Sequence, residues 1–199
     1  MTTKSKKVPF SYKKAKPLDL SFEDLESLEP NTLRVFSTGF VSSYRMLGVP
    51  SKRDGRYKTA SLLLSHNRLT GGLDDIRLLV DKLFRQPDAL CWLDLSHNRL
   101  TDLSDTLLGF PNLCTLYLHH NRLSSLCVVA RINRLPRLRS LTLQNNPVAV
   151  YRGYRTAVLT VLRRITRLDF VIVTNGERRL LPPIHLQSFI KNVLLGHKS

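Results

Sequence analysis

Four segments of the 199-residue chain repeat one short pattern that closes with an asparagine. The segments are TASLLLSHNRL (59–69), LCWLDLSHNRL (90–100), LCTLYLHHNRL (113–123) and LRSLTLQNNPV (138–148). All are versions of L-x-x-L-x-L-x-x-N-x-L, and their asparagines are 31, 23 and 25 residues apart. Alternating apolar residues are typical of a short strand with one buried face. Four copies in register predict a solenoid of stacked strands, which usually presents a surface and rarely encloses a reaction.

The spacing of the second copy places its side chains on two opposite faces. Leu93 and Leu95 point into a core, whereas Trp92 and Asp94 point outward. Asn98 turns inward where the strand ends, and its amide has the donors and the acceptor needed to satisfy backbone groups of the sharp turn. We expect this structural role for the asparagine of every copy, Asn67, Asn98, Asn121 and Asn146.

The pattern is that of the leucine-rich repeat. It predicts an α/β solenoid with a curved parallel sheet of about five strands, helices or helical turns on the convex side, and a helical cap at each end. A fifth, degenerate copy begins at Ile165 and has Val173 in the place of the asparagine. In the first copy Thr59 replaces the first leucine, so we expect this copy near an edge of the sheet.

One repeat domain with appendages accounts for the length of the chain. Residues 1–17 contain six lysines and two prolines and are predicted to be a flexible basic arm. Residues 18–58 are expected to hold an N-terminal capping helix and an irregular segment. The repeats and their cap occupy residues 59–174, and residues 175–199 carry a C-terminal amphipathic helix.

Apolar residues at helical spacing predict where the helices lie. The capping helix is expected to begin at Ser21, a plausible N-cap, and to end at Pro30. The C-terminal helix has Pro183 near its start and Gly196 past its end, and it packs either on the solenoid or on another protein. A last strand is expected at Arg167–Phe170. Further helices or helical turns are expected at 73–85, 103–110, 126–134 and 151–164.

The net charge of +16 is unevenly distributed. Residues 1–58 carry 12 basic and 6 acidic side chains, and residues 59–120 carry 5 basic and 7 acidic ones. Residues 121–199 carry 14 basic side chains against Asp169 and Glu177 alone. The excess therefore lies in the N-terminal arm and the C-terminal third. Such a field favours a polyanionic partner, which includes nucleic acid, acidic protein tails and anionic lipid.

The cysteines and the hydropathy indicate a compartment. Cys91, Cys114 and Cys127 show no C-x-x-C spacing, which favours a reducing environment. Cys91 and Cys114 hold the same position in their copies and are expected to be neighbours across strands. The sequence shows neither an apolar run of membrane-spanning length nor a signal-peptide core. We therefore expect a cytoplasmic protein with no membrane partner.

Outward positions of the strands are the candidates for partner binding. The strand period places the aromatic side chains of Trp92 and Tyr117 on the open face. Exposed aromatic residues with arginine at the rim are typical anchors of protein interfaces. The predicted partner-binding residues are Trp92, Asp94, Tyr117, His119, Arg139 and Arg167.

Two columns of equivalent residues flank the asparagines. His66, His97 and His120 recur at strand spacing, and because ladder side chains run parallel and do not converge, we interpret them as solvated surface without a metal. The second column, which we call the arginine column, consists of Arg68, Arg99 and Arg122. Its positive charges repel one another unless an acidic partner lies across them, although arginine is also common at this position of such repeats. The residues expected to face a polyanion are Arg68, Arg99, Arg122, Arg131, Arg134, Arg137, Arg163 and Arg164.

Catalytic motifs are missing from the sequence. It contains no nucleophile elbow, no Gly-rich phosphate loop and no zinc-type spacing. We therefore expect a protein that is not an enzyme and that needs no cofactor and no metal. The expected activity is protein binding by a single copy of the chain, without homo-oligomerisation.

Three stretches resemble the leucine-rich repeat-containing protein 51 family. They are PLDLSF (17–22), ALCWLDLSHNRLTDL (89–103) and LPRLRSLTLQNNP with GYRTAVLTVLRRITRLDFVIVT (135–147, 153–174). The C-terminal part also resembles the repeat cap of phosphatase regulators and spliceosomal proteins. The basic arm and the helix after Leu180 depart from the family pattern.

The resemblance implies a small cytoplasmic repeat protein, and similar short repeat proteins are common in motile cilia. It favours a structural component of the ciliary or flagellar axoneme that is associated with doublet microtubules. Its basic surface would face tubulin, whose C-terminal tails are glutamate-rich, or other axonemal proteins. The alternative is a regulatory adaptor of a phosphatase or of a spliceosomal-type RNA–protein particle, with nucleic acid the less favoured direct partner.

Overall fold

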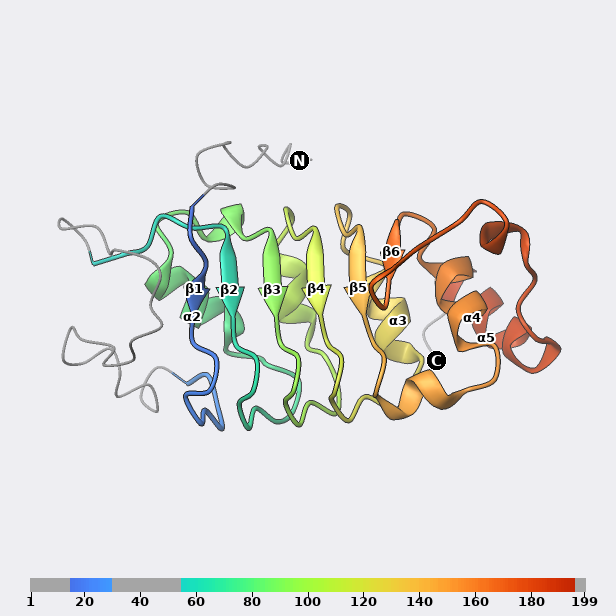
Figure 1. The fold of residues 1–199 in the computed structure, drawn as a ribbon, viewed down its shortest axis with the longest axis horizontal. Helices are drawn as coiled ribbons and strands as arrows, with labels where there is room; N and C mark the ends of the chain where they lie inside the picture. Colours follow the sequence, from blue (N-terminus) through green and yellow to red (C-terminus); the bar gives the residue numbers. More distant parts are fainter. Residues whose placement is uncertain (1–14, 30–54, 196–199) are drawn as a thin grey trace.

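The computed structural model describes residues 15–29 and 55–195. Within them the strands form one seven-stranded sheet, whose strand order is the order along the chain. Strands β1 to β6 pair in parallel and lie side by side along the long axis (Figure 1), and β7 pairs antiparallel with β6. The predicted leucine-rich repeat solenoid is confirmed. The strands are β1 Leu18–Asp19, β2 Ser61–Leu63, β3 Trp92–Asp94, β4 Thr115–Tyr117, β5 Ser140–Thr142, β6 Arg167–Leu168 and β7 Val171–Ile172.

The parallel register stacks equivalent residues of successive copies. A row of leucines runs through the middle of the sheet from Leu62 and is fully buried. Their neighbours along each strand face the other way and most stay partly exposed, as the strand period of two requires. One continuous apolar core therefore lies between the sheet and the segments that return behind it. The buried row consists of Leu62, Leu93, Leu116, Leu141 and Leu168.

The return segments cover the convex side of the sheet with short helices (Figure 1). In α2 the residues Ile76, Leu79 and Val80 recur at helical spacing and are buried against the sheet. The four helical segments predicted between residues 73 and 164 are confirmed, each with tighter bounds. The helices before the C-terminal end are α2 Ile76–Leu83, η2 Pro87–Ala89, η3 Asp105–Gly109, α3 Cys127–Ile132, η4 Pro147–Val150 and α4 Tyr154–Val161.

The C-terminal helix packs on the solenoid itself. After η5 (Glu177–Arg179), α5 (Ile184–Leu195) lies against α4, and its residues Leu186 and Ile190 join the apolar core. The Pro183 ring lies so close to Gly153 that a Cβ there would be 2.3 Å from Cγ of the proline. Since Gly153 also has a φ of 80°, only glycine fits this contact without strain.

The N-terminal capping helix predicted to begin at Ser21 is wrong. Residues 21–29 contain no helix, because this stretch belongs to a further copy that starts at β1 and stacks on β2. Leu18, Leu20 and Leu25 are buried like the leucines of the later copies. The first asparagine-closed copy therefore lies one strand in from the edge of the described sheet, which is near an edge, as expected.

The hydrogen bonds of Asn67 explain why the stretch after β1 folds as a repeat and not as a helix. Its Oδ1 accepts hydrogen bonds from the backbone N–H groups of Glu23 and Leu25 at 3.1 and 3.0 Å. Its Nδ2 donates to the carbonyl of Leu20 at 2.9 Å. Phe22 adopts a φ of 63°, which a right-handed helix does not allow. Long-range bonding to the next copy thus replaces the local bonds that a helix would form.

The last parallel strand is shorter than predicted. β6 ends at Leu168, and Asp169 and Phe170 form a turn with φ values of 51° and 65°. Oδ1 of Asp169 accepts from the backbone N–H groups of Leu143 and Gln144 at 2.7 and 2.9 Å. This carboxylate ties the turn to the preceding copy, so the strand prediction is wrong at residues 169–170 and the chain continues into β7.

The asparagines are buried, and each amide joins its own copy to the preceding one. Oδ1 of Asn98 accepts from the N–H of Leu69 at 3.0 Å, and its Nδ2 donates to the carbonyls of Leu64 and Leu95 at 2.9 and 3.1 Å. Because buried backbone groups must be paired, these amides are structural. Equivalent bonds are made by Asn67, Asn121 and Asn146.

Two parts of the predicted domain organisation lie outside the described residues. The basic arm is described only at residues 15–17, and the irregular segment only at residues 55–58.

Candidate protein-binding surface

The open face of the sheet carries a chain of contacting aromatic rings. Trp92 on β3 meets Tyr117 on β4 edge to face, with ring centroids 5.9 Å apart. Tyr117 meets Phe170 at 5.4 Å, and Phe170 meets His119 at 5.3 Å. We call these four residues, Trp92, Tyr117, His119 and Phe170, the aromatic patch.

Strand register assembles three members of the patch, and the β6–β7 turn supplies the fourth. Asp94 pairs directly with Tyr117 across β3 and β4, and Trp92 lies on the same face two residues earlier. Phe170 reaches the patch from the turn and is 49% exposed. Phe170 could not be predicted as a patch residue from the sequence, because the turn that carries it depends on the long-range bonds of Asp169.

The other predicted binding residues lie around the patch. Oδ1 of Asp94 accepts from the N–H and the hydroxyl of Ser96 at 2.9 and 2.7 Å, so half of this carboxylate is engaged locally. Arg139 and Arg167 are exposed at the starts of β5 and β6. Neither guanidinium has a carboxylate partner within the part of the chain that the structure describes.

The rings of the aromatic patch carry no charge at pH 7, and one of their hydrogen-bond donors has no partner. Nδ1 of His119 lies 2.9 Å from Oγ1 of Thr142, and burial lowers the pKa of this imidazole, so the ring is neutral at pH 7. Nε1 of Trp92 is buried and has no hydrogen-bond partner. A buried donor left unpaired costs about 1–3 kcal/mol, and such groups are rare in folded proteins.

A second set of rings lies where the chain leaves the strands. Phe22, His66, His97 and His120 are stacked, with successive centroids 4.2, 4.0 and 4.1 Å apart and interplanar angles of 7°, 11° and 16°. We call these residues the ring column. As expected of surface residues, His66 and His120 are exposed, and the three histidine rings also pack on one another, with Phe22 covering one end. At the other end, Nδ2 of Asn145 lies 2.8 Å from Nε2 of His120.

The predicted basic residues divide into paired and unpaired arginines. Arg68 pairs with Asp24 and with Glu26 of the first copy. Four more are held by carboxylates or by asparagine oxygens on the convex side: Arg131, Arg134, Arg137 and Arg164.

Three of the predicted basic residues lack a partner. Among residues 15–29 and 55–195, no carboxylate lies within ion-pair distance of Arg99, Arg122 or Arg163. Of the other predicted basic residues, Arg68, Arg131 and Arg134 form ion pairs, whereas Arg137 and Arg164 donate to neutral asparagine oxygens.

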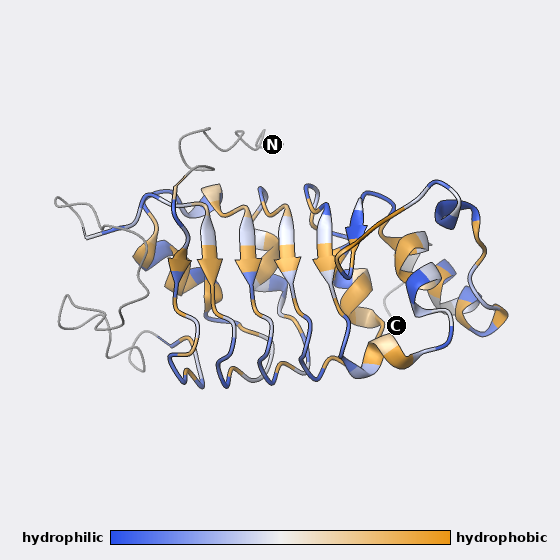
Figure 2. Cartoon of the chain, viewed as in Figure 1, coloured by the Kyte–Doolittle hydropathy of each residue, from blue (hydrophilic) through white to orange (hydrophobic). Residues whose placement is uncertain are grey.

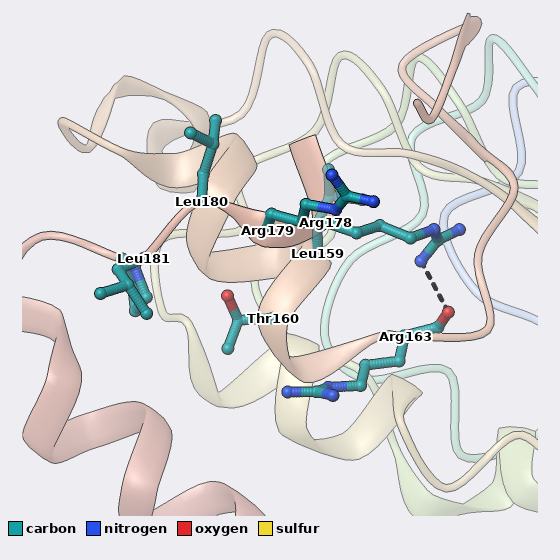
Figure 3. Close-up of a pocket in the computed structure, with 8 residues that line it drawn as sticks. Leu159, Thr160, Arg163, Arg178, Arg179, Leu180 and Leu181 are labelled. Atoms are coloured by element: carbon teal, nitrogen blue, oxygen red, sulfur yellow. Dashed lines mark hydrogen bonds between the residues drawn. The ribbon is translucent and has the colours of Figure 1, made fainter. Parts of the chain in front are cut away.

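A pocket of about 190 Å³ lies at the C-terminal end, beside α4 and the segment after η5 (Figure 3). Arg178 spans it and donates to the Arg163 carbonyl at 2.7 Å, and Leu180 and Leu181 line the apolar side. The Thr160 hydroxyl donates to the carbonyl of Thr156 at 2.8 Å. The lining holds no carboxylate, imidazole or thiol, so it offers no general acid or base.

Residues 15–29 and 55–195 contain no group of three histidine, cysteine, aspartate or glutamate side chains that fits a metal ion. No helix among them is long and apolar enough to span a bilayer. Within these residues the three cysteines form no disulfide, and the N–H of Cys114 donates to the carbonyl of Cys91 at 2.7 Å, so these two residues are neighbours as predicted.

Comparisons with known proteins agree with this architecture. The family model described as leucine-rich repeat matches residues 72–181. Mouse leucine-rich repeat-containing protein 51 is 40% identical over 162 residues, which cover 81% of each chain. U2 small nuclear ribonucleoprotein A' of Neurospora crassa is 36% identical over 86 residues, which cover 43% of this chain and 34% of that protein.

A solved structure shares the fold. A chain in the Drosophila melanogaster SNF/U2A' complex superposes with a TM-score of 0.60 and covers 95% of both chains, at 20% sequence identity. Leucine-rich repeat proteins are typically non-catalytic binding modules, and the curved sheet is their binding surface. The fold and the family match make this chain a protein-binding scaffold of that kind. The resemblance noted in the sequence is confirmed: the chain belongs to the leucine-rich repeat-containing protein 51 family.

Proposed function

We propose that this chain is a non-catalytic scaffold that holds a protein partner on the open face of its sheet, with the aromatic patch as the anchor. The observation that carries the proposal is the continuous contact of four rings, Trp92, Tyr117, His119 and Phe170, on a partly exposed face.

The composition of the patch fits the energetics of interfaces. A few aromatic and arginine residues supply most of the binding free energy of a typical interface. The unpaired Arg139 and Arg167 stand at the rim, where they are available to a partner's carboxylates or carbonyls. The orphaned Nε1 of Trp92 supports a partner as well, since a rotamer change on binding brings this donor to an acceptor.

The setting that we propose is the ciliary or flagellar axoneme, within the cytoplasm. There the protein is a structural component associated with doublet microtubules, and it contacts the acidic surface of tubulin. The net charge of +16 and the unpaired Arg99, Arg122 and Arg163 support this setting, because they attract an acidic partner. The proposal includes no catalytic step and no cofactor.

A second candidate is a role in a spliceosomal-type RNA–protein particle. It is favoured by the similarity to U2 small nuclear ribonucleoprotein A' and by the fold shared with a chain of the SNF/U2A' complex. In this setting the open face binds a small partner domain and the protein enters the nucleus.

Locating the tagged full chain in ciliated cells before and after detergent extraction separates the two candidates. We expect the protein to remain with the extracted axoneme at low salt and to leave at high salt, because its contacts are partly ionic. We expect the double variant Trp92→Ala and Tyr117→Ala to be lost at the detergent step.

The matched control is Leu78→Ala, which removes an apolar side chain that is 55% exposed on α2, away from the open face. It should stay with the axoneme like the unmodified chain. A diffuse nuclear signal would overturn the axonemal setting. Retention of the Trp92 and Tyr117 variant would overturn the open face as the binding surface.

A further inference from the structure

The loop edge of the sheet carries two parallel columns of side chains. His97 and Arg99 flank the buried Asn98 on the outer side of their loop, and His120 and Arg122 flank the next asparagine in the same way. These loops form the lower edge of the molecule, and Figure 2 shows them as mostly hydrophilic. The rings are stacked about one strand spacing apart, so the arginines recur at a similar interval.

The copy closed by Asn67 shows which chemical groups the arginine column binds. Its Arg68 forms ion pairs with the carboxylates of Asp24 and Glu26, which lie in the loop of the neighbouring copy. Two acidic residues on one short peptide segment therefore already occupy one position of the column. Arg99 and Arg122 hold the equivalent positions, and no carboxylate of the described chain reaches them.

The pKa of His97, in the ring column next to these arginines, depends on nearby charges. Burial and the neighbouring His66, His120 and His119 lower the pKa of His97, and Asp94 acts in the opposite direction. His97 is therefore neutral at pH 7. Carboxylates placed along the column add to the effect of Asp94 and favour the protonated imidazole.

We propose that the loop edge formed by the ring column, Arg99 and Arg122 binds an acidic, glutamate-rich peptide, and that His97 takes up a proton when the peptide binds. This inference rests on the acidic partner in the proposed function, but it concerns a second surface. That surface adjoins the aromatic patch at His119, whose ring centroid lies 5.3 Å from that of His97 and 5.8 Å from that of His120. Binding therefore strengthens as the pH falls, since the complex holds more protons than the free protein.

The test uses the purified full chain and a tetramethylrhodamine-labelled oligoglutamate, with affinity measured by fluorescence anisotropy at constant low salt. We expect the dissociation constant to fall about three- to tenfold between about pH 7.5 and about pH 6.0, because uptake of one proton changes affinity by at most tenfold per pH unit. The glutamates stay ionised over this range, so the change reports on the protein.

Two variants separate charge from protonation. Arg99→Gln with Arg122→Gln should weaken binding about tenfold at both pH values, because two charged contacts are lost. His97→Asn should lose the pH dependence of binding. Asparagine fits there, since Asn145 occupies the equivalent position with a φ of 56°. Circular dichroism checks that each variant keeps its fold.

Arg152→Gln with Arg179→Gln is the control, since it removes the same charge from exposed positions at the C-terminal end. It should bind within about twofold of the unmodified chain. Equal weakening in this control, or affinity that does not change with pH, would overturn the proposal. An oligothymidylate that displaces the peptide and depends on the same arginines would assign the edge to nucleic acid instead. The Trp92→Ala and Tyr117→Ala variant should bind the peptide normally, so a failure here is distinct from a failure of the open-face proposal.

Discussion

The middle copies of the solenoid and its two ends are held together by different chemistry. In the middle, Asn98 and Asn121 repeat one set of neutral hydrogen bonds to the backbone of the preceding copy. At the ends the asparagine position is lost, with Glu23 in the first copy and the Asp169 turn in the last. The contacts between middle copies thus follow one repeated pattern of hydrogen bonds, whereas the contacts at each end are made by residues that do not recur in other copies.

At the C-terminal end a carboxylate makes the backbone contacts that an asparagine amide makes in the middle copies. Asp169 accepts two backbone N–H groups and the hydroxyl of Tyr154, whose pKa is raised by burial and by this carboxylate. Nε of Arg155 lies 2.6 Å from Oε1 of Glu177, and this bond helps to lower the pKa of Glu177 to about 2. The comparison predicts that the middle is broken by removing amides and the end by removing carboxylates.

Removing one of the buried asparagine amides should have the largest effect on stability. Asn98→Ala leaves the N–H of Leu69 without a partner in the core and removes one of the two amide donors to each of the Leu64 and Leu95 carbonyls, so we expect a loss of about 3 kcal/mol in the free energy of unfolding. Urea unfolding followed by circular dichroism measures it. The exposed Asn175→Ala is the control and should stay within about 0.5 kcal/mol. Equal stability of the two variants would show that the asparagine amides do not stabilise the middle copies.

Removing the carboxylate at the C-terminal end should cost somewhat less. Asp169→Ala frees the N–H groups of Leu143 and Gln144, and we expect a loss of about 2 kcal/mol, whereas Tyr154→Phe removes one hydrogen bond and should cost about 1 kcal/mol. The same unfolding assay ranks them. Asp169→Asn retains an oxygen acceptor without the charge; full stability of this variant would show that the end needs only an acceptor, as the middle does.

Acidification should have the smallest effect and should act on the middle. The pKa of His97 in the folded chain lies below the 6.5 of an exposed histidine, so the unfolded chain binds the proton more readily. Stability is therefore complete above about pH 6.5 and falls, by less than about 1 kcal/mol, as the pH drops toward the lowered pKa. His97→Asn should reduce the difference between unfolding midpoints at about pH 7.5 and about pH 5.5. A larger drop in that variant would contradict the assignment.

The repeats could be predicted because their signal is local and recurs. Leu93 and Leu95 alternate within one copy, and the spacing to Asn98 is repeated along the chain. At the N-terminal end the same residues carried two patterns. Ser21 suits a helix cap, while Leu18 and Leu20 alternate like a strand, and only the bonds from Asn67 decide between them.

The candidate surface was predictable in part for the same reason. Strand alternation places Trp92 and Tyr117 on the open face, and the structure has them in contact. Phe170 was missed because its turn is fixed by a carboxylate bonded 26 residues away along the chain. Likewise the pairing of Arg68 with Asp24 spans 44 residues, so the sequence alone did not separate the paired arginines from the free ones.

The position of β1 has a consequence for how the chain is made. Leu18 pairs with Leu62, 44 residues later, whereas the step from Leu93 to Leu116 spans 23. Doubling a loop adds only about 0.6 kcal/mol to its closure, so the longer step matters little at equilibrium. During synthesis it matters more, because the N-terminal strand leaves the ribosome well before its partner. The segment translated first is thus the one that must wait to be docked, and growth of the solenoid proceeds from the second copy onward.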